Sequence, residues 1–121
     1  MPSRILIVED DRAMARLERS ALVRAGLEVS VVHSAFDAMV AVETEHYDLF
    51  VIDLFLPDGD GFALCQQLRQ VYDTPTVIVS SLDPDIGAGL VAAEDGPRAF
   101  LPKPLAMADL VNTVHEVLAA A

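Results

Sequence analysis

Short apolar runs alternate with segments of helical spacing along the whole chain. The apolar runs, typical of buried strands, lie at about 4–8, 28–33, 48–53, 76–79 and 99–101. The helical segments follow them at about 12–25, 34–45, 62–71, 83–96 and 107–120. Strands that are apolar throughout and alternate with helices predict a parallel sheet covered by helices on both faces. We therefore expect one α/β domain over residues 1–121, a (βα)5 doubly wound sheet of five strands.

Prolines, glycines and apolar stripes add detail to this arrangement. Pro102 has no N–H to donate to a strand ladder, so the fifth strand is expected at a sheet edge. Gly87 and Gly89 each cost about 1 kcal/mol relative to alanine, so the fourth helix is expected to be weak. The first two helices are recognised by apolar residues at helical spacing, at Met14, Leu17, Ala21, Leu22 and Ala25 and at Phe36, Met39, Val40 and Ala41. Leu64, Cys65 and Leu68 share one face of the third helix, and the predicted buried stripe of the last helix is Leu110, Val114, Val117 and Leu118.

Composition excludes several classes of protein. Hydrophobic residues make up 53% of the chain, which opposes disorder. No apolar run approaches the ~20 residues of a membrane span, and the N-terminus enters a strand pattern at once, so we expect neither a membrane segment nor a signal peptide. Cys65 is the only cysteine, which excludes an internal disulfide and a cysteine-based metal site. A reducing cytoplasm is the expected compartment.

The charge balance is strongly acidic. The chain carries 19 acidic and 8 basic residues, a formal net charge of −11. Direct binding to nucleic acid is not expected, because phosphate contacts need clustered lysine and arginine. An excess of carboxylates keeps a protein soluble, and some of them are available to hold a cation.

Polar residues with related chemistry stand where the predicted strands end. Glu9 and Asp10 follow the first strand, Asp53 ends the third, Ser80 follows the fourth and Lys103 the fifth. Parallel strands bring their carboxyl ends to one edge, where α/β proteins bind ligands. Crowded carboxylates repel one another unless a cation such as Mg²⁺ lies among them, while a lysine and a hydroxyl suit phosphoryl oxygens. The pattern predicts phosphoryl transfer with Asp53 as the nucleophile.

The chain resembles the receiver domains of two-component response regulators over essentially its whole length. Four motifs carry the resemblance: Ile5-Leu6-Ile7-Val8-Glu9-Asp10-Asp11, Asp53-Leu54-Phe55-Leu56-Pro57-Asp58-Gly59-Asp60-Gly61, Val79-Ser80-Ser81 and Lys103-Pro104. The resemblance implies a flavodoxin-like fold with strand order 2-1-3-4-5. It also implies a cis peptide bond between Lys103 and Pro104.

The resemblance further assigns roles to individual residues. Asp53 would accept a phosphoryl group from the phosphohistidine of a sensor histidine kinase or a phosphotransfer protein. The ligands of Mg²⁺ would be Glu9, Asp10, Asp53 and the backbone carbonyl of Phe55. Lys103 would contact the phosphoryl group. Ser80 and Phe100 would form the switch.

Further expectations concern the output and the lifetime of the phosphorylated form. The fourth helix, fifth strand and last helix would form the output face and a surface for homodimerisation. The protein would not be a turnover enzyme on an external substrate. Phe55 and Leu82 stand where the family tunes dephosphorylation, and neither can hydrogen-bond a water, so we expect slow hydrolysis. Ala106 replaces a common cap of the last helix, which is therefore expected to start late or to be capped at Asp109.

Three other functions were weighed against this one. A flavodoxin-like cofactor binder needs a phosphate loop rich in serine, threonine and glycine, where this chain has Glu9-Asp10-Asp11. A haloacid-dehalogenase-type phosphatase needs a second acid two residues after the nucleophile, where this chain has Phe55. A receiver-like interaction module that is never phosphorylated usually loses part of the site. The remaining polar residues are expected to be structural: Asp11 as a helix cap, Asp58 and Asp60 as turn formers, and His33, His46 and His115 at or near the surface.

Overall fold

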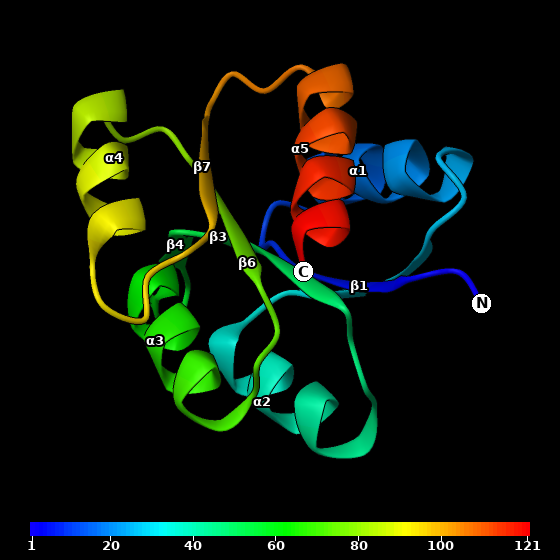
Figure 1. Cartoon of the computed structure of the whole chain (residues 1–121), viewed down its shortest axis with the longest axis horizontal. Helices are drawn as coiled ribbons and strands as arrows, with labels where there is room; N and C mark the ends of the chain where they lie inside the picture. The colour runs from blue at the N-terminus through cyan, green and yellow to red at the C-terminus, as the bar shows by residue number, and fades with distance from the viewer.

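A five-stranded parallel sheet forms the centre of the computed structural model, which describes residues 1–121 (Figure 1). Its order is β2-β1-β3-β6-β7, and all four neighbouring pairs are parallel. The prediction of order 2-1-3-4-5 is confirmed, because the strands named β4 and β5 are a separate two-residue hairpin. The strands are β1 Arg4–Val8, β2 Glu28–Val32, β3 Leu49–Asp53, β4 Phe55–Leu56, β5 Gly59–Asp60, β6 Thr76–Ser80 and β7 Ala99–Pro102.

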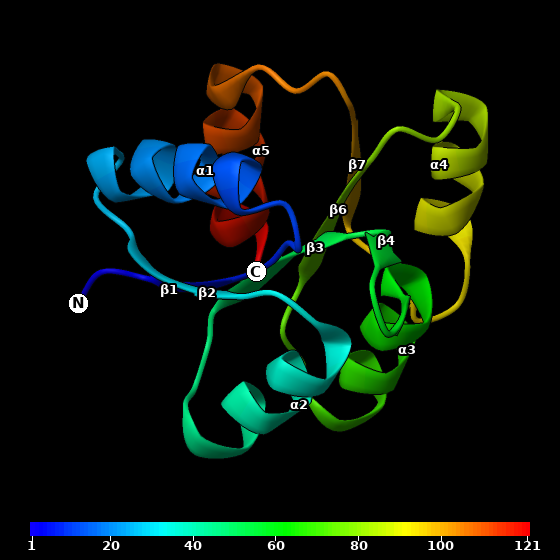
Figure 2. The same cartoon turned by 180° about the vertical axis from the view of Figure 1, so that it is seen from behind.

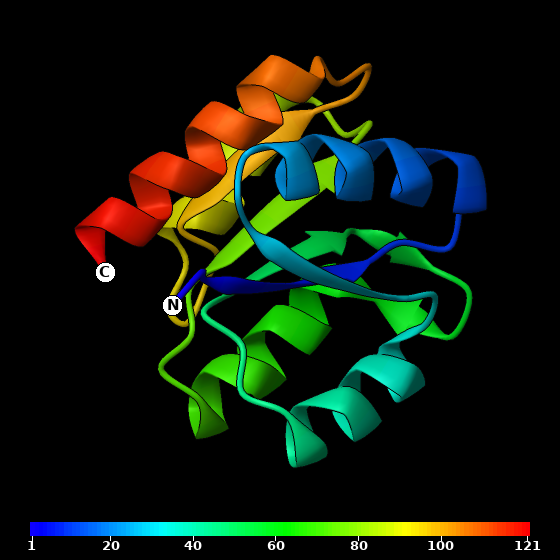
Figure 3. The same cartoon turned by 90° about the vertical axis from the view of Figure 1, so that its right-hand side faces the viewer.

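Helices cover both faces of this sheet. In Figure 3, α1 and α5 lie on one face, and α2 and α3 lie on the other. The remaining helix, α4, lies against the edge strand β7. The helices are α1 Arg12–Arg24, α2 Ala35–Thr44, α3 Gly61–Val71, α4 Pro84–Ala92 and α5 Met107–Ala120. None of the five has the length and apolar character that crossing a bilayer requires.

The side chains of β1 contribute to two apolar layers, one on each face of the sheet. Ile5 and Ile7 pack under α1 and α5, while Leu6 and Val8 pack against the α2 and α3 side. All four are fully buried. Successive residues of a strand point to opposite faces, so a central strand covered on both sides is apolar throughout.

The apolar spacing of the first two helices does not identify their inward faces. Leu17 is 56% exposed and Phe36 is 70% exposed. The inward residues of α1 are Ala15, Glu18 and Leu22, and those of α2 are Ala38 and Val42. Alanines and apolar residues lie on several sides of these helices, so spacing alone did not fix their rotation. The packing of α1 between the sheet and α5 fixed the rotation of that helix.

Two helix ends also differ from expectation. The helix α4 ends at Ala92 rather than near Asp95-Gly96, because the chain turns there and Asp95 adopts a positive φ of 55°. The helix α5 begins at Met107 with Ala106 as an N-cap that makes no side-chain hydrogen bond. The range 107–120 predicted from the spacing is therefore confirmed, and the expectation of a late start or a cap at Asp109 is wrong. Asp109 lies in the first turn, where its charge favours the helix dipole.

The predicted structural roles of the loop acids are confirmed. Asp11 caps α1 by accepting from the Met14 N–H at 3.1 Å, and Asp60 caps α3. Asp58 does more than form a turn, because its carboxylate accepts from the N–H groups of Ala35 and Phe36 at 2.8 and 2.9 Å. These two hydrogen bonds lower the pKa of Asp58. They tie the loop after Asp53 to the start of α2.

Candidate functional site

The carboxyl ends of four strands meet at one edge of the sheet. Glu9 follows β1, Asp53 ends β3, Ser80 ends β6 and Lys103 follows β7. The Lys103 ammonium lies 3.1 Å from Glu9 Oε1 and 3.4 Å from Asp53 Oδ2. Glu9 and Asp53 are buried and Lys103 is half-buried. The fold thus joins an acid and a base that are 94 residues apart in the sequence.

Three carboxylates of this edge form a donor set for a cation. One oxygen each of Glu9, Asp10 and Asp53 lies within 4.8 Å of the other two. Asp10 is exposed, so the set is open to solvent on one side. Hard divalent ions such as Mg²⁺ prefer this kind of oxygen donor and retain several waters. The Phe55 N–H lies 3.3 Å from Asp53 Oδ1, while the role of its carbonyl stays a prediction.

Crowding of these groups perturbs their ionisation. The pKa of Glu9 is raised to about 7, chiefly by burial and also by the neighbouring Asp53 carboxyl, which together outweigh the opposing effect of Lys103. Burial lowers the pKa of Lys103, but its hydrogen bond to Glu9 and the charges of both carboxylates outweigh that effect and raise it. A divalent cation would favour the ionised form of Glu9. The acidic set therefore suits an added positive charge.

The predicted switch residues lie on the flank of this site. Ser80 is fully buried, and its hydroxyl accepts from the Leu82 N–H at 3.2 Å. The Lys103 N–H donates to the Ser80 carbonyl at 2.8 Å, which ties the ends of β6 and β7 together. Phe100 is half-buried and packs with the cluster of Leu54, Cys65 and Ile78. The expected cis bond between Lys103 and Pro104 is present.

Comparison with known proteins identifies the family. The response regulator receiver domain model matches residues 5–115, which include Glu9, Asp53 and Lys103. This chain is a response regulator receiver domain. The assignment decides against a flavodoxin-like cofactor binder and a haloacid-dehalogenase-type phosphatase.

Relatives of this receiver domain are response regulators and other signalling proteins. It is 33% identical over 115 residues to the transcriptional activator protein IrlR of Burkholderia pseudomallei, covering 95% of this chain and 50% of IrlR. It is 30% identical over 118 residues to the response regulator MprA of Mycobacterium bovis, covering 98% of this chain and 51% of MprA. The chain thus spans about half the length of these curated relatives.

Solved structures show the same fold. The receiver domain of the Francisella response regulator 1452 matches with a TM-score of 0.90 and 27% identity, covering 98% of each chain. A sensor protein from Polaromonas sp. JS666 matches with a TM-score of 0.89 and 31% identity, covering 98% of this chain and 97% of that one.

Gly61 is a site residue whose importance the sequence did not reveal. It was expected only as part of a turn. In the receiver domain its N–H donates to the Leu54 carbonyl at 2.7 Å, and a Cβ at this position would overlap the backbone carbonyl of Asp53. Glycine is therefore required for α3 to begin directly against the backbone of Asp53. A glycine eight residues after the predicted nucleophile was the available signal.

Glu18 is the second residue that sequence reasoning missed. Its side chain lies on the inward face of α1 and is 1% exposed, and its Oε1 has no hydrogen-bond partner. Burial raises its pKa to about 8, and the charge of Glu9 adds to the shift. The available signal was the position of Glu18 four residues after Met14 and four before Leu22, in line with the apolar positions of α1.

His33 also lies nearer the site than expected. Its Nδ1 is 2.9 Å from the Glu9 carbonyl oxygen, and its Nε2 is 3.1 Å from the Arg12 guanidinium. The half-buried position predicted for it is confirmed. His46 and His115 are exposed, as expected, and Cys65 is a buried core residue.

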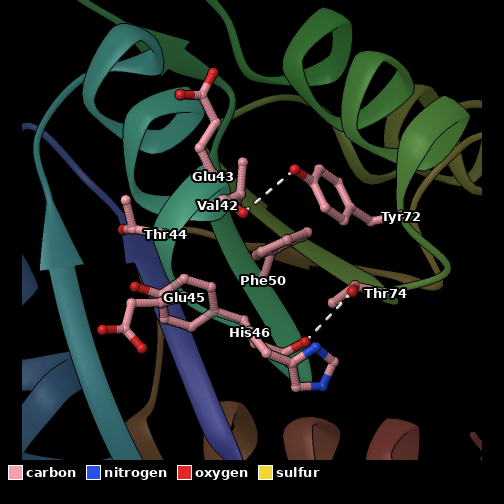
Figure 4. Close-up of a pocket in the computed structure, with 9 residues that line it drawn as sticks. Val42, Glu43, Thr44, Glu45, His46, Phe50, Tyr72 and Thr74 are labelled. Atoms are coloured by element: carbon pink, nitrogen blue, oxygen red, sulfur yellow. Dashed lines mark hydrogen bonds between the residues drawn. The ribbon is translucent and has the colours of Figure 1, made fainter.

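Two hollows lie near opposite edges of the sheet. One, of about 340 Å³, is lined mainly by apolar residues that include Leu54 and Phe55, directly after Asp53, and Leu82. The other, of about 310 Å³, lies between the ends of α2 and α3 (Figure 4). It contains none of the residues predicted to carry the chemistry.

Proposed function

We propose that this receiver domain accepts a phosphoryl group on Asp53 from the phosphohistidine of a sensor histidine kinase or a phosphotransfer protein. The observation that carries the proposal is the single cluster formed by the Glu9, Asp10 and Asp53 carboxylates and the Lys103 ammonium. Every side chain that the chemistry needs is present, which favours this function over an interaction module that is never phosphorylated. We place the exchange in the cytoplasm, since a lone buried thiol fits a reducing compartment.

The transfer itself requires little from the protein beyond position and charge. A carboxylate oxygen of Asp53 forms a bond to phosphorus as the bond from phosphorus to the histidine nitrogen breaks, and the electron pair of that bond stays on the imidazole. Glu9, Asp10, Asp53 and the Phe55 carbonyl would hold Mg²⁺, which supplies positive charge to the phosphoryl oxygens. Lys103 would exchange its contacts with Glu9 and Asp53 for one with the phosphoryl group. The reaction is a single turnover on the protein itself.

Phosphorylation would be read out on the side of the molecule next to Ser80. The Ser80 hydroxyl accepts only from Leu82 N–H in this structure, so its own proton is available to a phosphoryl oxygen. Movement of Ser80 would open space near Phe100, which packs against α4 at Gly87. The output surface would comprise α4, β7 and α5, and homodimerisation through it is one form the output would take.

Acetyl phosphate with Mg²⁺, followed by intact-mass measurement, tests the proposal without a cognate kinase. We expect the mass of one phosphoryl group to appear in wild type, to be absent from Asp53→Asn and to be absent in excess EDTA. Asp60→Asn is the matched control, because it removes a nearby exposed carboxylate while asparagine still caps α3. Uptake by Asp53→Asn at the wild-type rate would show that Asp53 is not the acceptor.

A further inference from the structure

Half of the basic residues in this acidic chain lie on one helix. Of its eight lysines and arginines, α1 carries Arg12, Arg16, Arg19 and Arg24. The only acid within the helix is Glu18, which is buried on the opposite, inward face. The exposed surface of α1 is therefore positive on a protein whose formal net charge is −11.

Three of these arginines line a hollow between α1 and the edge strand β2. Its volume is about 180 Å³, and it is lined by Arg12, Ala15, Arg16, Arg19, Val31 and His33. We call these six residues the α1–β2 groove. Figure 2 shows α1 lying over the β2 side of the sheet. Pockets for drug-sized ligands and cofactors are typically about 300–1,000 Å³, so this groove fits the ends of individual side chains.

No internal partner neutralises the groove. Arg12, Arg16 and Arg19 form no ion pair, although the chain has 19 acids. The nearest polar contact of Arg12 is with His33 Nε2 at 3.1 Å. Because His33 Nδ1 lies 2.9 Å from the Glu9 carbonyl, Nδ1–H donates to that oxygen and Nε2 accepts from the guanidinium. Both nitrogens of the uncharged ring are used, and the arginine charges remain unpaired.

Helix stability does not explain these arginines. Like charges three or four residues apart destabilise a helix by about 0.2–0.5 kcal/mol per pair, and Arg12–Arg16 and Arg16–Arg19 are two such pairs. Arg12 is also the first residue of the helix, where a positive charge opposes the dipole, and the first turn contains no acid. The arrangement weakens α1, so its explanation lies in something that binds there.

We propose that the α1–β2 groove is a docking surface for an acidic segment of a partner protein. The arginines follow one side of α1 over roughly 10 Å, which matches carboxylates spaced three or four residues apart on a partner helix. Arg12 begins directly after the Asp10–Asp11 pair, so the surface extends from the edge of the Asp53 site along α1. The chain's net charge disfavours larger polyanions, because nucleic acid or an anionic bilayer would also face the surrounding carboxylates.

A synthetic peptide can test the proposal on the whole chain. The probe is a labelled helical peptide of roughly 15 residues with glutamates three and four residues apart, and its control has glutamine at the same positions. At low ionic strength we expect the glutamate peptide to bind, and to shift the backbone NMR signals of Arg16, Arg19 and Val31. Binding should weaken as salt is added and should be absent for the glutamine peptide.

Two matched double variants separate the effect of the groove on peptide binding from the effect of net charge. Arg16→Gln/Arg19→Gln and Arg24→Gln/Arg98→Gln each remove two positive charges, but only the first pair lies in the groove. We expect the first to weaken peptide binding about 5- to 30-fold and the second less than about twofold. Thermal unfolding should show that Arg16→Gln/Arg19→Gln is at least as stable as wild type, since it relieves a like-charge pair.

Several results would overturn the proposal. One is equal loss of peptide binding in the two double variants, and another is unchanged binding in Arg16→Gln/Arg19→Gln. Binding of a short single-stranded DNA or of phosphatidylglycerol vesicles more tightly than the glutamate peptide would show that the groove serves another class of anion. Absence of any glutamate-peptide binding at low ionic strength would remove the acidic protein segment as its partner.

Discussion

The two hollows at opposite edges of the sheet have nearly the same volume and very different surroundings. Near the amino ends of β3 and β6, two hydroxyls that line the 310 Å³ hollow are satisfied internally. The Tyr72 hydroxyl donates to the Val42 carbonyl, and the Thr74 hydroxyl donates to the Tyr47 carbonyl (Figure 4). Near the carboxyl ends, the lining of the 340 Å³ hollow includes Leu54 and Phe55, which follow Asp53. On that side of the molecule the buried carboxyls of Glu9 and Glu18 have raised pKa values, and Glu18 Oε1 has no hydrogen-bond partner.

The volume of a hollow therefore does not identify which end of the sheet carries the functional site. Buried charge that lacks complete internal compensation costs folding free energy, and natural proteins retain it mainly where function needs it. At the amino edge the Tyr72 and Thr74 hydroxyls close on backbone carbonyls, and only the buried Thr76 hydroxyl at the start of β6 lacks a hydrogen-bond partner. The carboxyl edge retains buried carboxylates, as the proposed binding of a cation and a phosphoryl group requires. Removing a buried charge near the carboxyl edge should therefore stabilise the protein, whereas removing a hydroxyl at the amino edge should destabilise it.

Glu18→Gln is expected to give the largest change in stability. The folded-state pKa of Glu18 is about 8 and its ordinary value is 4.5, so between these values the unfolded chain loses a proton that the folded protein keeps. Wild type should therefore lose stability relative to Glu18→Gln by about 1.4 kcal/mol per pH unit as the pH rises through this window.

Denaturant unfolding in EDTA at pH 6, 7 and 8 checks this prediction. Glutamine has nearly the same shape but does not ionise, so the stability difference between the two proteins isolates residue 18. Glu18→Gln should become the more stable protein at the highest pH. Parallel pH profiles for the two proteins would show that Glu18 does not titrate in this window.

Gly61→Ala is expected to displace the backbone of Asp53 at the carboxyl end of β3. The added Cβ would overlap the Asp53 carbonyl, and such overpacking costs about 1–3 kcal/mol. It should also move Asp53 and slow the phosphorylation of the protein by acetyl phosphate. The loss of rate should be larger than the loss of folded protein accounts for. Gly59→Ala is the matched control, because nothing lies within 4 Å of its added Cβ. If both variants phosphorylate at the wild-type rate, the contact of α3 with Asp53 does not position the nucleophile.

Gly87 and Gly89 provide a second matched pair, within α4. A Cβ on Gly87 would overlap the Phe100 ring, whereas a Cβ on Gly89 would meet nothing. Gly87→Ala should lose about 1–3 kcal/mol and move Phe100, and Gly89→Ala should gain up to about 1 kcal/mol from helix propensity. Thermal unfolding and the aromatic NMR signals of Phe100 report these effects. A Phe100 signal unchanged by Gly87→Ala would show that α4 does not hold the ring.

Phe55→Asn/Leu82→Glu is expected to shorten the lifetime of the phosphorylated form. Phe55 is 57% exposed and both side chains line the apolar hollow beside Asp53, where neither can orient a water. Positioned acid–base groups contribute about 10²–10⁴-fold, and orienting a water contributes less, so an acceleration of roughly 10- to 100-fold is expected. Phosphate release at saturating Mg²⁺ measures it. A double variant no faster than wild type would assign the lifetime to other groups, such as Asp83.

Tyr72→Phe should have the smallest effect on stability. It tests whether the amino edge contributes to stability alone and not to phosphorylation. It removes the hydroxyl that donates to the Val42 carbonyl at 3.2 Å, which should cost about 0.5–1.5 kcal/mol. Phosphorylation by acetyl phosphate should stay at the wild-type rate, since Tyr72 lies at the far end of α3 from Asp53. Slower phosphorylation in a fully folded Tyr72→Phe protein would contradict the separation of the two edges.

The alternation of apolar runs with helical stripes was sufficient to predict the sheet and the edge where the polar residues gather. Each strand is short and apolar throughout, so its identity depends on local composition, and the ends of parallel strands must share one edge. The proposed acceptor, its acidic neighbours and Lys103 could therefore be named in advance. The order of the strands came from the family resemblance.

Tertiary packing determined the rotation of the helices and the contacts between distant elements, which the local sequence pattern does not specify. Leu17 and Glu18 are neighbours in α1, and only the contact of that helix with the sheet and α5 determined that the leucine faces solvent and the glutamate faces inward. Contact of Gly61 with Asp53, and of Gly87 with Phe100, likewise depends on how closely separate elements approach. The sequence by itself determined the elements and the chemistry at their ends. The rotation of each helix and the surroundings of each charge are properties of the whole packed chain, because they depend on residues far apart in sequence.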